Sequence, residues 1–139
     1  MKPLRPLIFV LRNFPITISP SGVADDCFTN PVGISDQSKI PDNRLTASSH
    51  YDDATYQPAY GRLNGTRGDG WCTKEATRHD DWLQVDLGIT VTICAAATQG
   101  DINANEWTTA FKLSYSIDGN VWKIYNDSNG TDKVSIYVL

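Results

Sequence analysis

Alternation of hydrophobic and polar residues predicts a strand in the second half of the chain. In WLQVDL, residues 82–87, the apolar Leu83, Val85 and Leu87 share one face while polar residues share the other. A period of two is the pattern of a strand that is buried on one side only. Gly88 follows the run. We therefore predict that a half-buried strand ends at this glycine.

A β-hairpin is predicted farther along the chain. Its first strand alternates polar residues with the apolar Phe111, Leu113, Tyr115 and Ile117. An Asp-Gly pair at 118–119 follows and leads into VWKIY at 121–125. Asp-Gly between two such runs favours the two-residue turn of a hairpin. These residues therefore predict two antiparallel neighbouring strands.

Two further segments differ from this alternation. Residues 91–98 are almost continuously apolar and include three alanines, which predicts a central strand approached closely by a second layer. Residues 48–82 show little periodicity but contain three tyrosines among many Gly, Asp and Thr residues. Long loops in small domains are usually functional or disordered, and aromatic residues argue against disorder. Binding chemistry is expected in this second segment.

Composition supports an all-β domain without nucleic-acid chemistry. The chain has 139 residues, which suits a single domain. Almost all of its acidic residues are Asp, which favours turns and loops over helices. The net charge of −4 and pI near 4.9 exclude the basic surface that nucleic acids or a polybasic membrane contact would need.

The N-terminal residues 1–26 are expected to lie outside the domain. They begin with basic residues and a short apolar run at 7–11, which Arg12 and several prolines interrupt. Two interpretations remain open: a degenerate secretory signal, or an arm outside the fold. Glycosylation acceptors at Asn64, Asn126 and Asn129 favour secretion weakly, and the last two are too close for both to carry glycans comfortably.

From Cys27 onward, many short motifs follow one another in a specific order. These motifs are PVGI at 31–34, IPD at 40–42, LTASS at 45–49, YGRLN at 60–64, GWC at 70–72, WLQVDLG at 82–88, ATQG at 97–100 and KLSYSIDGNVW at 112–122. Through the order of these motifs, and not through any one of them, the chain resembles the discoidin domain, also called the coagulation factor 5/8 C-terminal type domain.

The resemblance implies an antiparallel jelly-roll β-sandwich of the galactose-binding-domain-like type, here over residues 27–139. It also implies a non-catalytic, extracellular adhesion or lectin-like module with binding loops at one end. The family usually continues through further strands to a terminal cysteine that pairs with the first, whereas this sequence ends at Leu139. Truncation, or strands supplied by another chain, would explain the difference. Cys72 and Cys94 are then candidates for a disulfide, with a buried free thiol at Cys94 as the alternative.

The loops that the resemblance places at the binding end suit carbohydrate recognition. Aromatic rings stack on sugar rings, while amides and carboxylates bind hydroxyls; the alternative is that these aromatic residues only pack the loops. Asp52 and Asp53 are weak candidates for a structural calcium site. Adjacent acidic residues disfavour anionic lipid, so phosphatidylserine is the less favoured ligand. The candidate ligand-binding residues are Tyr51, Asp52, Tyr56, Asp101, Asn103 and Trp107.

The tripeptide Arg67-Gly68-Asp69 is a candidate integrin contact, because an exposed Arg and Asp could pair with a receptor acid and a receptor metal ion. An alternative uses the same residues. Arg67 and Asp69, followed by Lys74, resemble the second half of the fucose-binding motif of F-type lectins, although Asp42 stands where that motif has histidine.

No catalytic motif supports an enzyme. The sequence lacks a nucleophile elbow, metal-ligand spacing and a phosphate-binding glycine loop. We therefore expect a binding module whose partners are cell-surface or matrix glycans. An integrin is the alternative partner and anionic lipid the second alternative.

Overall fold

The structure is a computed structural model that describes residues 32–75, 80–91, 93, 96, 98–101, 103, 106–108 and 111–126, together with the backbone of one N-terminal strand. Within these residues there are five strands and two short 3-10 helices, and no α-helix. The all-β prediction is confirmed. The elements are β1 (Leu7–Arg12), η1 (Asp42–Arg44), β2 (Leu45–Ala47), η2 (Pro58–Gly61), β3 (Trp82–Asp86), β4 (Phe111–Ser116) and β5 (Lys123–Ile124).

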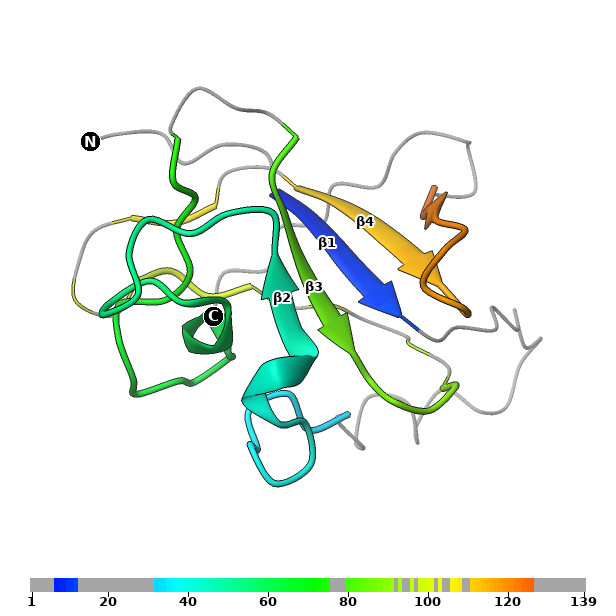
Figure 1. Cartoon of the computed structure of the whole chain (residues 1–139), viewed down its shortest axis with the longest axis horizontal. Coiled ribbons are helices and arrows are strands. Elements are labelled where there is room, and N and C mark those ends of the chain that lie inside the picture. The colour runs from blue at the N-terminus through cyan, green and yellow to red at the C-terminus, as the bar shows by residue number, and fades with distance from the viewer. Residues whose placement is uncertain are drawn as a thin grey trace.

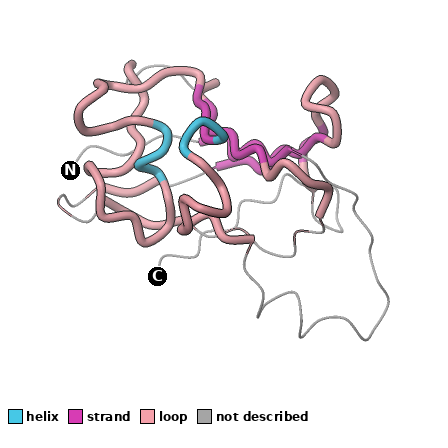
Figure 2. The backbone as a smooth tube through the Cα atoms, turned by 60° about the horizontal axis from the view of Figure 1, so that its bottom comes forward, coloured by secondary structure: helices cyan, strands magenta, loops and turns pink. Residues whose placement is uncertain are grey.

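The five strands form one sheet in the order β2-β3-β1-β4-β5 (Figure 1). The expected antiparallel pairing holds for β2 with β3 and for β4 with β5. It differs at β1, which runs parallel to both of its neighbours. Figure 2 shows the strands in one layer, with η1 and η2 beside it among the loops.

The middle of the sheet is occupied by the N-terminal strand β1. The sequence predicted an arm or signal at residues 1–26, whereas Leu7–Arg12 pairs along its length with both β3 and β4. Its sequence LIFVLR is apolar and rich in branched residues, which is typical of a strand with neighbours on both sides. Residues 91–98 were predicted to be a central strand. The described members of that segment, 91, 93, 96 and 98, belong to no strand, and the others lie outside the described residues.

The strand predicted at 82–87 is confirmed as β3, and its alternation matches its burial. Leu83 and Val85 are almost fully buried, while the residues between them are half-buried. Val85 and Leu87 form a core cluster with Ile40 and Leu45. Burying aliphatic side chains of this size stabilises a fold by about 1.5–3 kcal/mol each. This core supports the beginning of β2 and the 3-10 helix η1 before it.

The predicted antiparallel pairing of β4 and β5 is confirmed, but their connection spans residues 117–122 and not two residues, and the predicted buried face of β4 is wrong in part. Ile117 is exposed, while Ser114 and Ser116 are buried. Burial of Ser116 has a local cause, because its hydroxyl donates to Asp118 Oδ1 at 3.0 Å and accepts the amide of Gly119 at 2.9 Å. The serine thus closes the turn from inside, and Gly119 has the positive φ of +76° that a glycine tolerates.

Candidate functional site

Three loops meet at one end of the sheet and form the candidate site. We define the first loop as residues 50–56, the second as 67–72 and the third as 101–107, of which 101, 103, 106 and 107 are described. The second loop is tied to both others: the Asp69 amide donates to the Thr55 carbonyl at 3.0 Å, and Asn103 Nδ2 donates to Asp69 Oδ1 at 2.6 Å. Residues far apart in sequence are therefore held side by side.

The first loop presents an aromatic ring to solvent. Asp52 Oδ1 accepts the amides of Ala54 and Thr55 at 2.9 and 2.7 Å, which closes a tight turn. The rings of Tyr51 and Tyr56 pack edge to face, with centroids 5.7 Å apart. Tyr56 is half-buried, whereas Tyr51 remains 62% exposed. Tyr56 thus supports the exposed ring of Tyr51.

The third loop places polar groups beside these rings. The backbone amide of Asp101 donates to the Glu106 carbonyl at 2.9 Å, and Asp101 Oδ1 accepts a hydrogen bond from the backbone amide of Asn103 at 2.7 Å. Trp107 is 39% exposed at the end of this loop. Asn103 therefore contacts two carboxylates, one through its main chain and one, Asp69, through its side chain.

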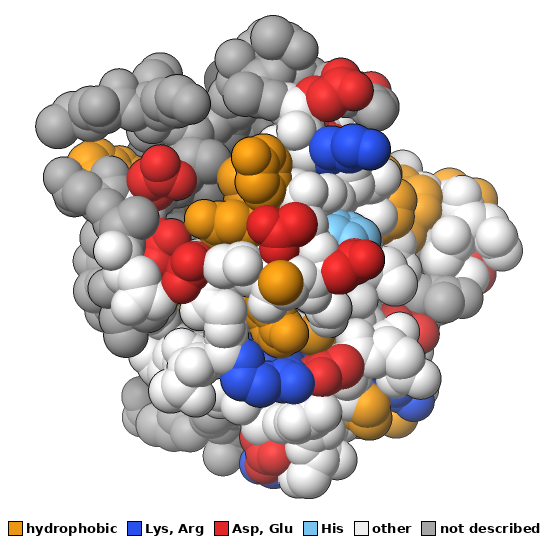
Figure 3. Space-filling view, turned by 60° about the vertical axis from the view of Figure 1, so that its left-hand side comes forward, with side chains coloured by type: hydrophobic (Ala, Val, Ile, Leu, Met, Phe, Trp, Pro, Cys, Tyr) orange, Lys and Arg blue, Asp and Glu red, His pale blue; other side chains and the backbone are white. Residues whose placement is uncertain are grey.

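The loop end is electrostatically acidic. Burial raises the pKa of Tyr56, and the nearby carboxylates of Asp69 and Asp101 raise it further. Burial likewise raises the pKa of the Cys72 thiol, with added contributions from Glu106 and Asp101. Figure 3, viewed from the loop side, shows hydrophobic and acidic side chains intermingled on this face. An uncharged ligand suits such a surface better than an anionic one.

The tripeptide Arg67-Gly68-Asp69 lies in the second loop, and each of its residues has an internal contact. Arg67 Nη2 donates to both carboxylate oxygens of Asp42 at 2.9 and 2.8 Å, and the guanidinium lies 5.5 Å from the centroid of the Tyr60 ring. Gly68 has a φ of +61°, and a Cβ atom there would lie 2.3 Å from both the Thr55 carbonyl oxygen and Tyr60 Cδ2. The turn therefore requires glycine.

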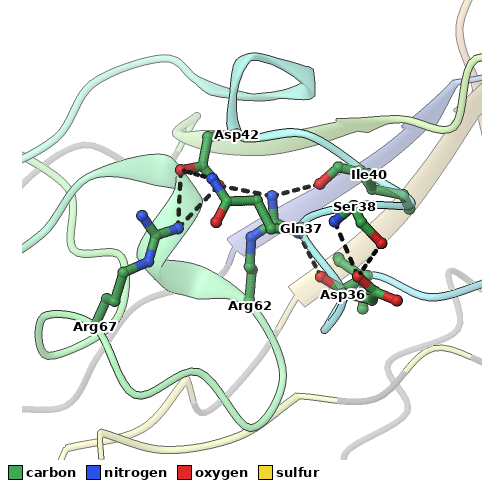
Figure 4. A network of polar contacts seen from close by, with 8 residues as sticks. Asp36, Gln37, Ser38, Ile40, Asp42, Arg62 and Arg67 are labelled. Carbon is green, nitrogen blue, oxygen red and sulfur yellow. Dashed lines mark hydrogen bonds and ion pairs between the residues drawn. The ribbon is translucent and has the colours of Figure 1, made fainter.

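Asp42 connects this loop to the core through a buried arginine (Figure 4). Arg62 donates to the carbonyls of Ile34 and Ile40 at 2.6 and 2.5 Å and to Asp42 Oδ1 at 2.8 Å. Burial raises the pKa of Asp42, but hydrogen bonds from Arg67 and then Arg62 outweigh it and leave the pKa below its usual value. The carboxylate is therefore ionised and bridges the two arginines.

Sequence reasoning missed Arg62, although YGRLN was among the motifs noted. A buried arginine cannot be distinguished from an exposed one by pattern, because its partners are backbone carbonyls of a distant segment. The structure does bring Arg67 against Asp42, the position where the F-type motif has histidine. Lys74 is exposed, and its backbone amide donates to Ser49 Oγ at 3.2 Å.

The weak calcium candidates do not converge. Asp52 closes its own turn, and Asp53 Oδ1 lies 2.5 Å from His50 Nε2. Among the described residues, no group of three His, Cys, Asp or Glu side chains could hold a metal ion. The structure records Cys72 as a free thiol. The sequence had offered Cys72 and Cys94 as a disulfide; in the structure Cys72 is unpaired, and Cys94 lies outside the described residues.

The glycosylation acceptors also stay predictions. Asn64 and Asn126 are both exposed, as a glycan would require, whereas Asn129 lies outside the described residues. Asn64 has a positive φ of 56°, and its backbone amide donates to Gln99 Oε1 at 2.8 Å. Asparagine is one of the few residues other than glycine that adopts this backbone conformation readily.

Comparison with known proteins assigns the domain. The family model of the F5/8 type C domain matches residues 44–138, a range that contains all three loops and strands β2 to β5. The chain belongs to the F5/8 type C family. The discoidin resemblance is thereby confirmed, and with it the jelly-roll class of the fold. F5/8 type C domains are non-enzymatic binding modules, and the proteins that carry them are typically extracellular.

Several lactadherins are similar to this F5/8 type C chain. Bovine lactadherin (Bos taurus) is 31% identical over 112 residues, which cover 75% of this chain and 26% of lactadherin. The pig protein (Sus scrofa) is 33% identical over 73% of this chain, and the rat protein (Rattus norvegicus) is 33% identical over 76%. The chain thus spans about a quarter of the length of these relatives. Among the described residues, no helix is long and apolar enough to cross a bilayer.

Proposed function

We propose that this F5/8 type C domain is an extracellular adhesion module that binds cell-surface or matrix glycans through its first and third loops. The observation that carries the proposal is the joining of these loops: an exposed Tyr51 ring lies on a supporting Tyr56, and the second loop ties this pair to Asn103 and Asp101. An aromatic platform beside fixed polar groups is the surface that a sugar ring requires.

Each component has a distinct role in this proposal. The face of Tyr51 covers the C–H surface of a pyranose, and Trp107 adds a second exposed aromatic surface. The Asp101 carboxylate and the Asn103 amide oxygen supply acceptors for sugar hydroxyl groups. The Tyr56 hydroxyl, whose pKa burial raises above the ordinary tyrosine value, is protonated at physiological pH and can donate a hydrogen bond. Prior hydrogen bonding within the loops reduces the ordering cost on binding.

The two alternatives receive less support from the geometry. An integrin contact would need a free guanidinium and a free carboxylate, but Arg67 is bound to Asp42 and Asp69 to Asn103. An anionic lipid headgroup would meet the carboxylates of Asp69 and Asp101 near the loop tips. An uncharged glycan needs no free Arg67 or Asp69 side chain and is not repelled by these carboxylates.

A glycan array tests the proposal with three proteins: wild type, Tyr51→Ala and Tyr125→Ala. Tyr125 is a matched control, because it is an exposed aromatic residue beside β5 and belongs to none of the three loops. We expect Tyr51→Ala to weaken glycan binding about tenfold, the effect of losing one stacking contact of about 1–1.5 kcal/mol. We expect Tyr125→Ala to bind like wild type. Absence of any glycan signal, or equal signals for the two variants, contradicts the proposal.

Two further measurements address the alternatives. Cell adhesion to wild type and Asp69→Glu, with and without free sugar, identifies receptor binding: adhesion lost with Asp69→Glu but insensitive to sugar would support an integrin. Flotation with phosphatidylserine vesicles identifies lipid binding. Repeating the array with EDTA tests a calcium requirement, which the arrangement of Asp52 and Asp53 does not suggest.

A further inference from the structure

The tripeptide Arg67-Gly68-Asp69 spans the distance between the core and the third loop. At its first residue, Arg67 is anchored to Asp42, which the buried Arg62 holds in turn. At its third residue, the Asp69 main chain is fixed to the first loop and its carboxylate to the Asn103 side chain. The tripeptide therefore links three parts of the molecule: the core, the first loop and the third loop.

The contact between Asp69 and Asn103 also determines which way the Asn103 amide faces. An ionised carboxylate can only accept hydrogen bonds, whereas the amide of asparagine has one donating and one accepting end. Asp69 Oδ1 therefore selects the nitrogen of Asn103, at 2.6 Å. Among the described residues the amide oxygen of Asn103 has no hydrogen-bond partner, so it can accept a hydrogen bond from a ligand. Without Asp69, either end of the amide could face the ligand.

We propose that Asp69 is a positioning residue of the glycan site: it orients the Asn103 amide, and Arg67 and Gly68 fix Asp69 in place. The inference rests on the proposed function. It assigns the tripeptide an internal role, since Asn103 already engages one oxygen of the carboxylate that a receptor metal ion would need. The proposed ligand is still a neutral sugar, and one of its hydroxyl groups donates a hydrogen bond to the side-chain amide oxygen of Asn103.

Gly68 strengthens the argument, because its position cannot relax easily. The atoms that would meet an added Cβ are the backbone carbonyl oxygen of Thr55, in the first loop, and the ring of Tyr60, in η2. Both lie far inside normal contact distance, and the backbone conformation is itself unfavourable for other residues. The second loop is therefore packed directly against the first and has little freedom to present the tripeptide to a receptor.

The test is a double-mutant cycle on glycan affinity with wild type, Asp69→Ala, Asn103→Ala and the double variant. If Asp69 acts through Asn103, we expect each single variant to lose about tenfold in affinity and the double variant to lose no more than Asn103→Ala. Losses that multiply would show that Asp69 contacts the sugar independently and would overturn the proposal. Unfolding midpoints measured for all four proteins must stay similar, which separates positioning from loss of the fold.

Asp69→Asn supplies a matched variant. It keeps an acceptor for the Asn103 amide but loses the carboxylate that a receptor metal ion would bind. The new amide can donate as well as accept, so it selects the orientation of the Asn103 side chain less strictly, and we expect glycan affinity between that of wild type and Asp69→Ala. Cell adhesion that falls in step with glycan affinity would agree with the internal role, while loss of adhesion with unchanged glycan affinity would overturn it.

A second measurement tests, without any sugar, whether Asp69 orients the Asn103 side chain. In nitrogen-15 spectra, we expect the side-chain amide protons of Asn103 to exchange slowly with solvent in wild type and faster in Asp69→Ala. If wild type binds no glycan, the proposed function fails. If the side-chain amide protons of Asn103 exchange at the same rate in wild type and Asp69→Ala, the positioning role of Asp69 is refuted, whatever the outcome of the array.

Discussion

Replacing the two arginines that share Asp42 should give very different losses of stability. Both donate to the same carboxylate, but the Arg62 side chain is 5% exposed and the Arg67 side chain is 48% exposed. Arg62→Ala also removes the donors of two backbone carbonyls, those of Ile34 and Ile40. Arg67→Ala removes only the contacts to Asp42 and to the Tyr60 ring.

The magnitudes follow from burial. Breaking a buried ion pair by removing one partner costs about 3–5 kcal/mol, and unsatisfied buried acceptors cost about 1–3 kcal/mol each. We therefore expect Arg62→Ala to lower the free energy of unfolding by at least about 3 kcal/mol, against a typical total of about 5–15 kcal/mol. An exposed ion pair contributes about 0–1 kcal/mol, so we expect Arg67→Ala to cost about 1 kcal/mol.

Urea denaturation followed by tryptophan fluorescence and far-ultraviolet circular dichroism measures both losses. Equal slopes with different midpoints would show that stability alone has changed. Arg62→Lys is included because it keeps the charge but loses the planar fork that reaches three acceptors, and it should fall between wild type and Arg62→Ala. The reasoning is refuted if Arg62→Ala costs less than about 1 kcal/mol, or no more than Arg67→Ala.

Three other outcomes are expected. Hydrogen bonds from the backbone amide of Val121 and its neighbours lower the pKa of Asp118 to about 2, so its NMR titration midpoint should lie there, and its contribution to stability, complete above about pH 4, should disappear as the pH falls toward 2. Burial and then Glu106 raise the pKa of Cys72, so its alkylation at pH 8 should be slow and should accelerate in Glu106→Gln; equal rates would contradict this. Gly68→Ala should lower the unfolding midpoint and weaken glycan binding together, whereas Gly70→Ala, which would meet nothing within 4 Å, controls for strain from a positive φ alone.

Local patterns predicted the elements whose burial follows their own alternation. In β3, Leu83 and Val85 are buried as the period of two requires. In β4 the pattern failed, because Ser114 and Ser116 are buried while Ile117, next to the turn, is exposed. A serine that satisfies its hydroxyl within a turn can be buried, and hydrophobicity alone does not reveal this.

The candidate site shows the same division between local and distant contacts. The sequence identified Tyr51 and Asn103 as candidates because of residue type and family resemblance. It could not show that Asn103 binds Asp69, since the two are 34 positions apart and no periodicity links them. Likewise, the sequence suggested an integrin contact from the tripeptide Arg67-Gly68-Asp69 alone. Only the structure shows that the side chains of Arg67 and Asp69 have partners within the molecule.

The placement of β1 has a consequence for the order of folding. Leu7 pairs with Phe111 and Ile8 with Trp82, so the central strand can enter the sheet only after most of the polypeptide has been synthesised. Pairings this distant carry a large loop-closure entropy and tend to slow folding. Until β1 arrives, the facing edges of β3 and β4 lack partners and are open to other chains, which makes the nascent domain prone to aggregation.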